Sequence, residues 1–129
     1  MRAERVVGVA ALLMATGIGI GALASHALRP LLLPRQLESL ATAVDYQLLN
    51  ALGLLLVGIM MKNMPVTGLR AVAWMLVAGI LCFSGGIYVM LAGAPRYLGL
   101  VTPAGGVLLI AAWSLLAWKT IKGSALNRL

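Results

Sequence analysis

Charged residues are scarce in this sequence. They make up 10% of its 129 residues, whereas 62% are hydrophobic. Soluble domains carry about 25% charged and about 45–50% apolar residues, so this chain has too little polar surface to cover an exterior that faces water. Disordered chains are poor in apolar residues, which excludes disorder as well. The composition therefore predicts an integral membrane protein.

Residues that carry chemistry are also few. The single cysteine, Cys82, permits neither an intrachain disulfide nor a cysteine-based zinc site, and the single histidine, His26, leaves a metal site short of ligands. Only three acidic residues are available for acid–base work. The sequence shows no nucleophile, base and orienting residue of the kind that catalysis needs. We therefore expect no catalytic residues, no metal and no cofactor.

Four apolar stretches are long enough to cross a membrane as helices, which takes about 20 residues each. They cover about residues 6–28, 41–61, 71–94 and 98–118. Their apolar runs do not alternate with polar residues as barrel strands do, and only helices or closed barrels satisfy their own backbone groups in lipid. Short connectors make neighbouring helices antiparallel. We therefore expect residues 1–129 to form one domain, an all-α up-down bundle of four transmembrane helices.

Local signals suggest how two of these helices begin. Thr102 followed by Pro103 is typical of an N-cap and a first-turn proline, which predicts that the fourth helix opens there. Residues 35–41 are predicted to form an amphipathic lead-in to the second helix, with Leu37, Leu40 and Val44 on one stripe.

The first stretch has a second interpretation as a signal peptide. Arg2 and Arg5 precede an apolar run, and Ala22-Leu-Ala24 resembles a cleavage site. The run spans the 23 residues from Val6 to Leu28, however, whereas the apolar region of a signal peptide has about 7–15 residues. We expect it to be retained; cleavage would leave three helices and move the N-terminus to the other side.

The basic residues predict the orientation of the bundle, because Lys and Arg near helix ends favour the cytoplasmic side. Arg29, Arg35 and Arg96 belong to one end. The other end holds seven: Arg2, Arg5, Lys62, Arg70, Lys119, Lys122 and Arg128. Both termini are therefore expected in the cytoplasm, with the chain as a multi-pass protein of the cytoplasmic (inner) membrane.

The net charge of +7 raises the question of nucleic acid as a partner. No basic–aromatic interleaving and no base-reading module accompany it. Basic residues that flank spans instead meet anionic lipid headgroups. Membrane lipids are the expected partners, and nucleic acid is not.

Polar side chains within spans are costly in lipid, so each invites a functional hypothesis. In the predicted topology they gather toward the outer end of the bundle and could form a polar cup open to that side. The candidate residues are His26, Asp45, Gln47, Asn50, Ser84, Tyr88, Arg96 and Thr102.

A structural role competes with this hypothesis at each position. Amides such as Gln47 and Asn50 often hydrogen-bond one helix to another. His26 lies close enough to the interface to be hydrated or bonded to backbone. For Asp45, an ion pair with Arg96, Arg29 or His26 is favoured over a role as a proton carrier, because charges inside a membrane are normally paired.

Small residues predict where helices approach one another closely. Gly17 and Gly21 are spaced as a small-xxx-small motif, which Ser25 continues. Gly85 and Gly86 are expected to mark another close crossing, as are Gly105 and Gly106. Packing within the bundle is favoured over a subunit interface. Ala15, Gly19 and Ala22 form a second small face on the first helix.

Several motifs resemble the YgdD-like small inner-membrane proteins, a family with a domain of unknown function. The resemblance extends from about Gly8 to Trp118. It rests on Gly21-Ala-Leu-Ala-Ser-His-Ala-Leu28, Thr42-Ala-Val-Asp-Tyr-Gln47, Phe83-Ser-Gly85 with Tyr88 after it, Arg96-Tyr-Leu-Gly99 and Thr102-Pro-Ala-Gly-Gly106.

The resemblance implies a four-helix protein of the cytoplasmic membrane and no settled activity. It also contains one departure, because the family usually places a histidine where this chain has Asn50. A relay or metal site built on two histidines is therefore not expected here.

We expect a non-enzymatic membrane protein that acts through contacts with lipid, with copies of itself or with a larger membrane complex. The alternative is a small transporter or channel component that handles an ion or small polar solute at the cup and needs a homo-oligomer to enclose a pathway. An enzyme using Tyr88, His26 or Arg96 is the third hypothesis.

Overall fold

The computed structural model describes residues 1–126, which form four long helices and one short 3₁₀ helix. Each long helix is long and apolar enough to cross a membrane, so the prediction of an all-α chain with four transmembrane helices is confirmed. Arg128, which we assigned to the cytoplasmic end, lies outside the described residues. The elements are α1 (Ala3–Ser25), α2 (Pro34–Asn63), α3 (Leu69–Leu91), η1 (Arg96–Leu100) and α4 (Val101–Leu126).

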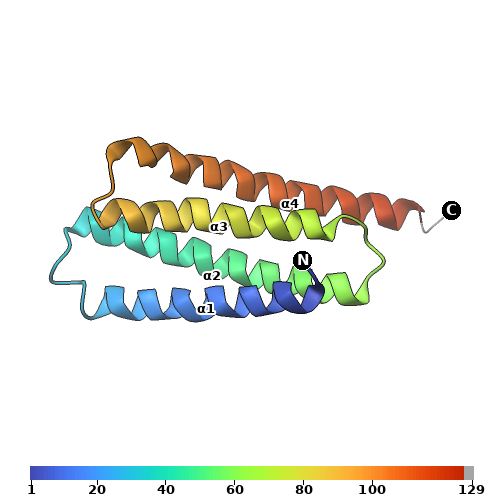
Figure 1. Cartoon of the computed structure of the whole chain (residues 1–129), viewed down its shortest axis with the longest axis horizontal. Helices are drawn as coiled ribbons and strands as arrows, with labels where there is room; N and C mark the ends of the chain where they lie inside the picture. The colour runs from blue at the N-terminus through green and yellow to red at the C-terminus, as the bar shows by residue number, and fades with distance from the viewer. Residues whose placement is uncertain (127–129) are drawn as a thin grey trace.

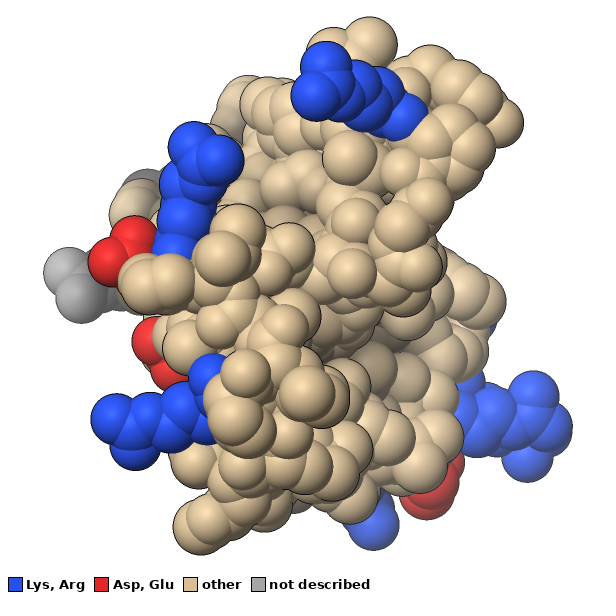
Figure 2. Space-filling model, turned by 90° about the vertical axis from the view of Figure 1, so that its left-hand side faces the viewer, with Lys and Arg blue, Asp and Glu red and all other residues tan. Residues whose placement is uncertain are grey.

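The four helices run antiparallel to their neighbours (Figure 1). The N-terminus, the α2–α3 connector and the end of α4 lie at one end, which we call the terminal end; the α1–α2 and α3–α4 connectors lie at the other. Viewed onto the latter end, most of the surface is uncharged and basic side chains stand around its edge (Figure 2). Within residues 1–126, the extensive interfaces join sequence neighbours: α1 with α2, α2 with α3, and α3 with α4.

The first helix ends earlier than predicted, at Ser25 rather than at Leu28. Pro30 explains the difference, because a proline ring clashes with the carbonyl four residues before it and restricts the residue that precedes it. His26 and Leu28 therefore lie in a turn, in which the Leu28 amide donates to the Leu23 carbonyl at 2.9 Å. The predicted span of residues 6–28 is thus wrong at its C-terminal end.

The second helix begins before residue 41 because Pro34 occupies its first turn, where the missing N–H costs nothing. The Gln36 side chain reinforces this start, since its Oε1 accepts a hydrogen bond from the Leu33 amide at 2.9 Å. The predicted amphipathic lead-in is therefore continuous with α2, and its residues Leu40 and Val44 are buried.

The last two helices also differ from their predicted limits. The third ends at Leu91, close to Gly93, whose positive φ of 97° terminates the helical path. The fourth follows η1 directly and begins at Val101. Thr102 is therefore inside the first turn and is not the predicted N-cap. The fourth helix also continues to Leu126 rather than ending at residue 118.

The apolar core lies toward the terminal end and draws on all four helices. The side chains without exposed surface include Val6 of α1, Leu54 of α2, and Val72 and Leu76 of α3. Leu109 of α4 completes the cluster. In lipid such a core is stabilised by close van der Waals packing, because burial from hydrocarbon carries no hydrophobic gain.

Gly105 marks the closest approach of α4 to α3. A Cβ atom at this position would overlap the backbone nitrogen of Phe83 and lie 2.8 Å from the carbonyl carbon of Cys82. Backbone cannot move aside as a side-chain end can, so we expect Gly105→Ala to destabilise the fold by about 1–3 kcal/mol. Thermal unfolding in detergent measures this loss.

Gly85 supplies the matched control on α3. A Cβ atom there would meet nothing within 4 Å, and alanine favours a helix over glycine by about 1 kcal/mol. Gly85→Ala should therefore leave the melting temperature unchanged or raise it. Equal melting temperatures for the two variants would contradict the close crossing at Gly105.

Candidate functional site

Gln47 lies where three helices meet and is 4% exposed. Its Nε2 donates to the Leu13 carbonyl at 2.8 Å and to the Thr16 hydroxyl at 2.9 Å, both on α1. Its Oε1 accepts a hydrogen bond from the Tyr88 hydroxyl of α3 at 2.7 Å. One amide of α2 therefore bonds to both neighbouring helices.

Asn50 lies one turn further along the same face of α2 and joins it to α4. The Trp113 indole Nε1 donates to Asn50 Oδ1 at 2.8 Å, while Asn50 Nδ2 donates to the Tyr46 carbonyl at 2.9 Å. The indole approaches so closely because it lies over Gly53, where a Cβ atom would overlap the ring. Trp113 thus reaches a helix with which α4 shares no extensive interface.

Ser84 makes the third interhelical contact. Its hydroxyl donates to the Ala43 carbonyl of α2 at 2.7 Å, and the side chain is 1% exposed. Positions 43, 47 and 50 fall on one face of α2, because they are spaced by four and three residues. We call the side chains of Thr16, Gln47, Asn50, Ser84, Tyr88 and Trp113 the polar layer.

The polar layer lies near mid-span and not at the outer mouth of the bundle. Gln47 bonds to residues 13 and 16 of α1, which runs from Ala3 to Ser25. At 1.5 Å per residue, these positions are close to the middle of that helix. The predicted gathering of polar side chains at the outer end is corrected accordingly.

Four of the eight candidate residues lie apart from the layer, and three of the four have exposed side chains. His26 follows α1, Asp45 is on α2 and Arg96 opens η1, and all three side chains are exposed. An ion pair of Asp45 would not be buried, because its predicted partners His26, Arg96 and Arg29 are exposed as well; the pair itself stays a prediction. Asp45 lies two residues before Gln47, about 200° around the helix from it.

Thr102 is also separate from the layer, because it packs on Gly86 of α3, where a Cβ atom would overlap its hydroxyl. The structure thus brings together Gln47, Asn50, Ser84 and Tyr88 in one layer, and it places His26, Asp45, Arg96 and Thr102 elsewhere. A single cup that contains all eight residues does not form.

The sequence reasoning missed Thr16 and Trp113 as members of the layer. Each had a detectable signal. Thr16 is one of few hydroxyl side chains in the first span, and an indole N–H in a span needs an acceptor. Neither signal names the partner, however, because the partner depends on how the helices are rotated.

The small residues singled out for packing divide into two groups. Gly17 lies against Leu48 and Gly21 against Val44, both on α2, and Gly86 lies against α4. Ser25 is exposed and its hydroxyl bonds only within its own helix, to the Gly21 carbonyl at 3.1 Å. Together with Gly85, which has open space around it, Ser25 is not at the close crossing we expected.

The chemistry of the polar layer is that of hydrogen bonding. Its groups are amides, hydroxyls and an indole, and within the described residues every buried side-chain nitrogen or oxygen has a partner. The same residues contain no group of three or more His, Cys, Asp or Glu side chains placed to hold a metal. The layer is therefore suited to fixing helices in place.

Comparison with known proteins gives one family for most of the chain. Residues 20–106 match a family model described as "Protein of unknown function (DUF423)". The UPF0382 membrane protein SSP2132 of Staphylococcus saprophyticus is 36% identical over 105 residues, which cover 81% of this chain and 87% of the relative.

Two further relatives carry the same description. The UPF0382 membrane protein SH2409 of Staphylococcus haemolyticus is 33% identical over 105 residues, 81% of this chain and 85% of its own length. The UPF0382 membrane protein YwdK of Bacillus subtilis is 31% identical over 106 residues, 81% and 86% of the two chains. No solved structure matches the chain.

Removal of the Tyr88 hydroxyl tests the polar layer. Tyr88→Phe deletes the donor to Gln47 Oε1 and leaves this acceptor without its partner on α3. We expect a loss of about 0.6–1.7 kcal/mol in the free energy of unfolding, the range measured for interhelical hydrogen bonds in membranes. Unfolding in detergent or bicelles gives the value.

Tyr97→Phe is the control, because Tyr97 is 75% exposed and belongs to η1. This variant should unfold like the parent protein. A Tyr88→Phe variant as stable as Tyr97→Phe would show that the hydrogen bond does not contribute to the stability of the bundle.

Proposed function

The chain belongs to the DUF423 family, whose relatives are UPF0382 membrane proteins, and we propose that it is a non-enzymatic protein that acts through its exposed helix faces. The partners of these faces would be lipid, further copies of the chain or a larger membrane complex. Its finer placement among YgdD-like proteins stays a prediction from the motifs.

This proposal rests on the hydrogen bonds that the side chains of the polar layer already make. The amide and hydroxyl groups of Gln47, Asn50, Ser84 and Tyr88 are already bonded to other helices or to their own backbone. An enzyme needs a nucleophile, a base and an orienting group around a space for substrate. Groups that satisfy one another in a packed interior are better suited to holding a scaffold in shape.

The surface of α1 adds support, because it leaves a small-residue face open. Gly8, Ala11, Ala15, Gly19 and Ala22 are all exposed, and a Cβ atom at Gly8 or Gly19 would meet nothing within 4 Å. Faces of this kind allow another transmembrane helix to approach closely. A second chain or a partner protein could occupy it.

The proposed location is the cytoplasmic membrane with both termini in the cytoplasm. The terminal end carries Arg2, Arg5, Lys62 and Arg70 together with the lysines of α4. The other end carries only Arg29, Arg35 and Arg96. This bias is the one that the positive-inside rule requires.

Native mass spectrometry in mild detergent tests the proposal. We expect the purified protein to retain further copies, a second protein or lipid. Gly19→Leu adds a large side chain to the open face of α1, where a Cβ atom would meet nothing within 4 Å, so it should reduce associated protein chains and leave the melting temperature unchanged. Ala111→Leu, at an exposed position of α4, is the control and should associate like the parent. A lone monomer with no bound lipid or protein would contradict the proposal.

The exposure of Asp45 within a span favours the alternative, a role in ion or solute transport. An acidic side chain on the exposed face of a span, next to the exposed Leu49 and Leu52, is costly in lipid unless it faces water or a partner. If the protein conducts a cation, Asp45→Asn should lower flux into liposomes at least several-fold. Thr42→Ala, an exposed change one turn away on α2, is the control. Absence of flux with the parent protein would exclude this function.

A further inference from the structure

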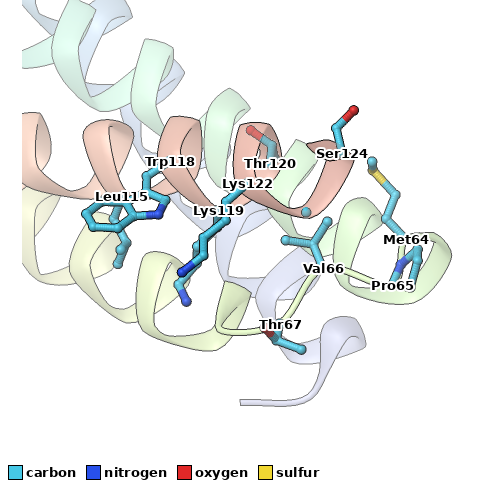
Figure 3. Close-up of a pocket in the computed structure, with 11 residues that line it drawn as sticks. Met64, Pro65, Val66, Thr67, Leu115, Trp118, Lys119, Thr120, Lys122 and Ser124 are labelled. Carbon is cyan, nitrogen blue, oxygen red and sulfur yellow. The ribbon is translucent and has the colours of Figure 1, made fainter. Parts of the chain in front are cut away.

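A groove of about 790 Å³ opens at the terminal end of the molecule. One wall is the α2–α3 connector, with Met64 and Val66, and the other is the C-terminal half of α4 (Figure 3). Leu115 makes the wall on α4 apolar, and Trp118, Lys119 and Lys122 line it further along the helix. The groove therefore has apolar side chains on both walls and two lysines on α4.

The two lysine side chains extend from α4 in the same direction, beside the Trp118 indole (Figure 3). Lys122 Nζ lies 5.9 Å from the centre of the Trp118 ring. Lys119 is half-buried, and its ammonium lies against Gly68 at the start of α3. Packing thus holds one of the two cations in place, and an aromatic ring lies beside the other.

Among the described residues of the groove, acidic side chains do not offset this positive charge. No acidic side chain is among the described residues that line the groove, and the first turn of α3, beside Lys119, has no acidic residue either. The N-terminal end of a helix itself carries a partial positive charge, which adds to the potential at Gly68. The charge of the groove is complementary to an anion.

The position of the groove indicates the kind of anion. Trp118 is 64% exposed on a membrane-spanning helix, and exposed tryptophans of this kind mark the level of lipid headgroups. Basic pockets between transmembrane helices on the cytoplasmic side bind the headgroups of anionic lipids. Leu115, one turn of α4 further into the bundle than Lys119, offers an apolar surface for acyl chains.

We propose that this groove binds the phosphate of an anionic phospholipid in the leaflet at the terminal end. Lys119 and Lys122 contact the phosphate, and Leu115, one turn of α4 further into the bundle, lies beside the acyl chains. The inference deepens the proposed function and rests on it, since it names one of the lipids with which the protein would make contact.

Native mass spectrometry with defined lipids tests the groove. The parent protein in detergent is mixed with equal amounts of phosphatidylglycerol and phosphatidylcholine and is then released from the micelle in the mass spectrometer. We expect preferential retention of phosphatidylglycerol. The double variant Lys119→Gln/Lys122→Gln should weaken phosphatidylglycerol binding by about 25-fold, about fivefold for each lysine near a lipid surface, and leave phosphatidylcholine binding unchanged.

Three further variants separate this effect from misfolding and from net charge. Lys122→Gln alone changes an exposed side chain and should weaken binding by about fivefold. Arg29→Gln/Arg35→Gln removes the same charge at the opposite end and should bind like the parent. Lys119→Arg/Lys122→Arg keeps both cations and should retain the lipid.

Excess inorganic phosphate distinguishes a lipid from a soluble anion. Retention of phosphatidylglycerol in its presence supports a lipid site, and complete displacement overturns it in favour of free phosphate. Equal retention of the two lipids by the parent, or undiminished phosphatidylglycerol binding by Lys122→Gln, would also contradict the proposed lipid site. These results would leave the proposed function standing, because it fails only when the protein retains no lipid, copy or partner.

Discussion

The hydrocarbon interior of a membrane contains no water that could hydrogen-bond with a side-chain amide. Each polar atom within a span must therefore find a partner inside the protein. Gln47 meets this requirement by bonding to α1 through its nitrogen and to α3 through its oxygen. A shift of either neighbour by one residue would turn those partners away. The bonds of one side chain therefore fix the register of three helices, and the remaining contacts depend on that register.

Glycines allow the helices to come close enough for these bonds to form. Gly17 and Gly21 admit the side chains of α2, and Gly105 admits the backbone of α3. Gly53 admits the Trp113 ring, which lets the indole reach Asn50. In a membrane the contribution of such contacts is van der Waals packing, so close approach and hydrogen bonding stabilise the same arrangement.

A satisfied interior leaves the surface as the place where this protein meets its surroundings. The open small face of α1 and the basic groove beside α4 are different kinds of surface, one suited to another helix and the other to an anion. Asp45 is a third, because it is the acidic side chain on the otherwise apolar exposed stripe that continues through Leu49 and Leu52. In the proposed function, lipids and proteins of the membrane are the partners of these surfaces.

The amino-acid sequence alone predicts the four spans, since a run of about 20 apolar residues has few stable arrangements other than a helix across lipid. It also placed both ends of the chain together, because four antiparallel helices return the chain to its starting side. The ends of the helices were harder to predict from the sequence. The effect of Pro30 on α1 and of Pro34 on α2 depends on local backbone geometry, which a hydropathy pattern does not contain.

Which polar side chains meet depends on how the helices pack against one another. Asp45 and Gln47 are two residues apart, yet one is exposed and the other is buried among three helices. Trp113 and Asn50 are 63 residues apart and share a hydrogen bond. The composition shows that a polar group in lipid is unfavourable unless it has a hydrogen-bond partner. The rotation and register of each helix determine which partner it finds, and these follow from contacts between segments distant in the chain.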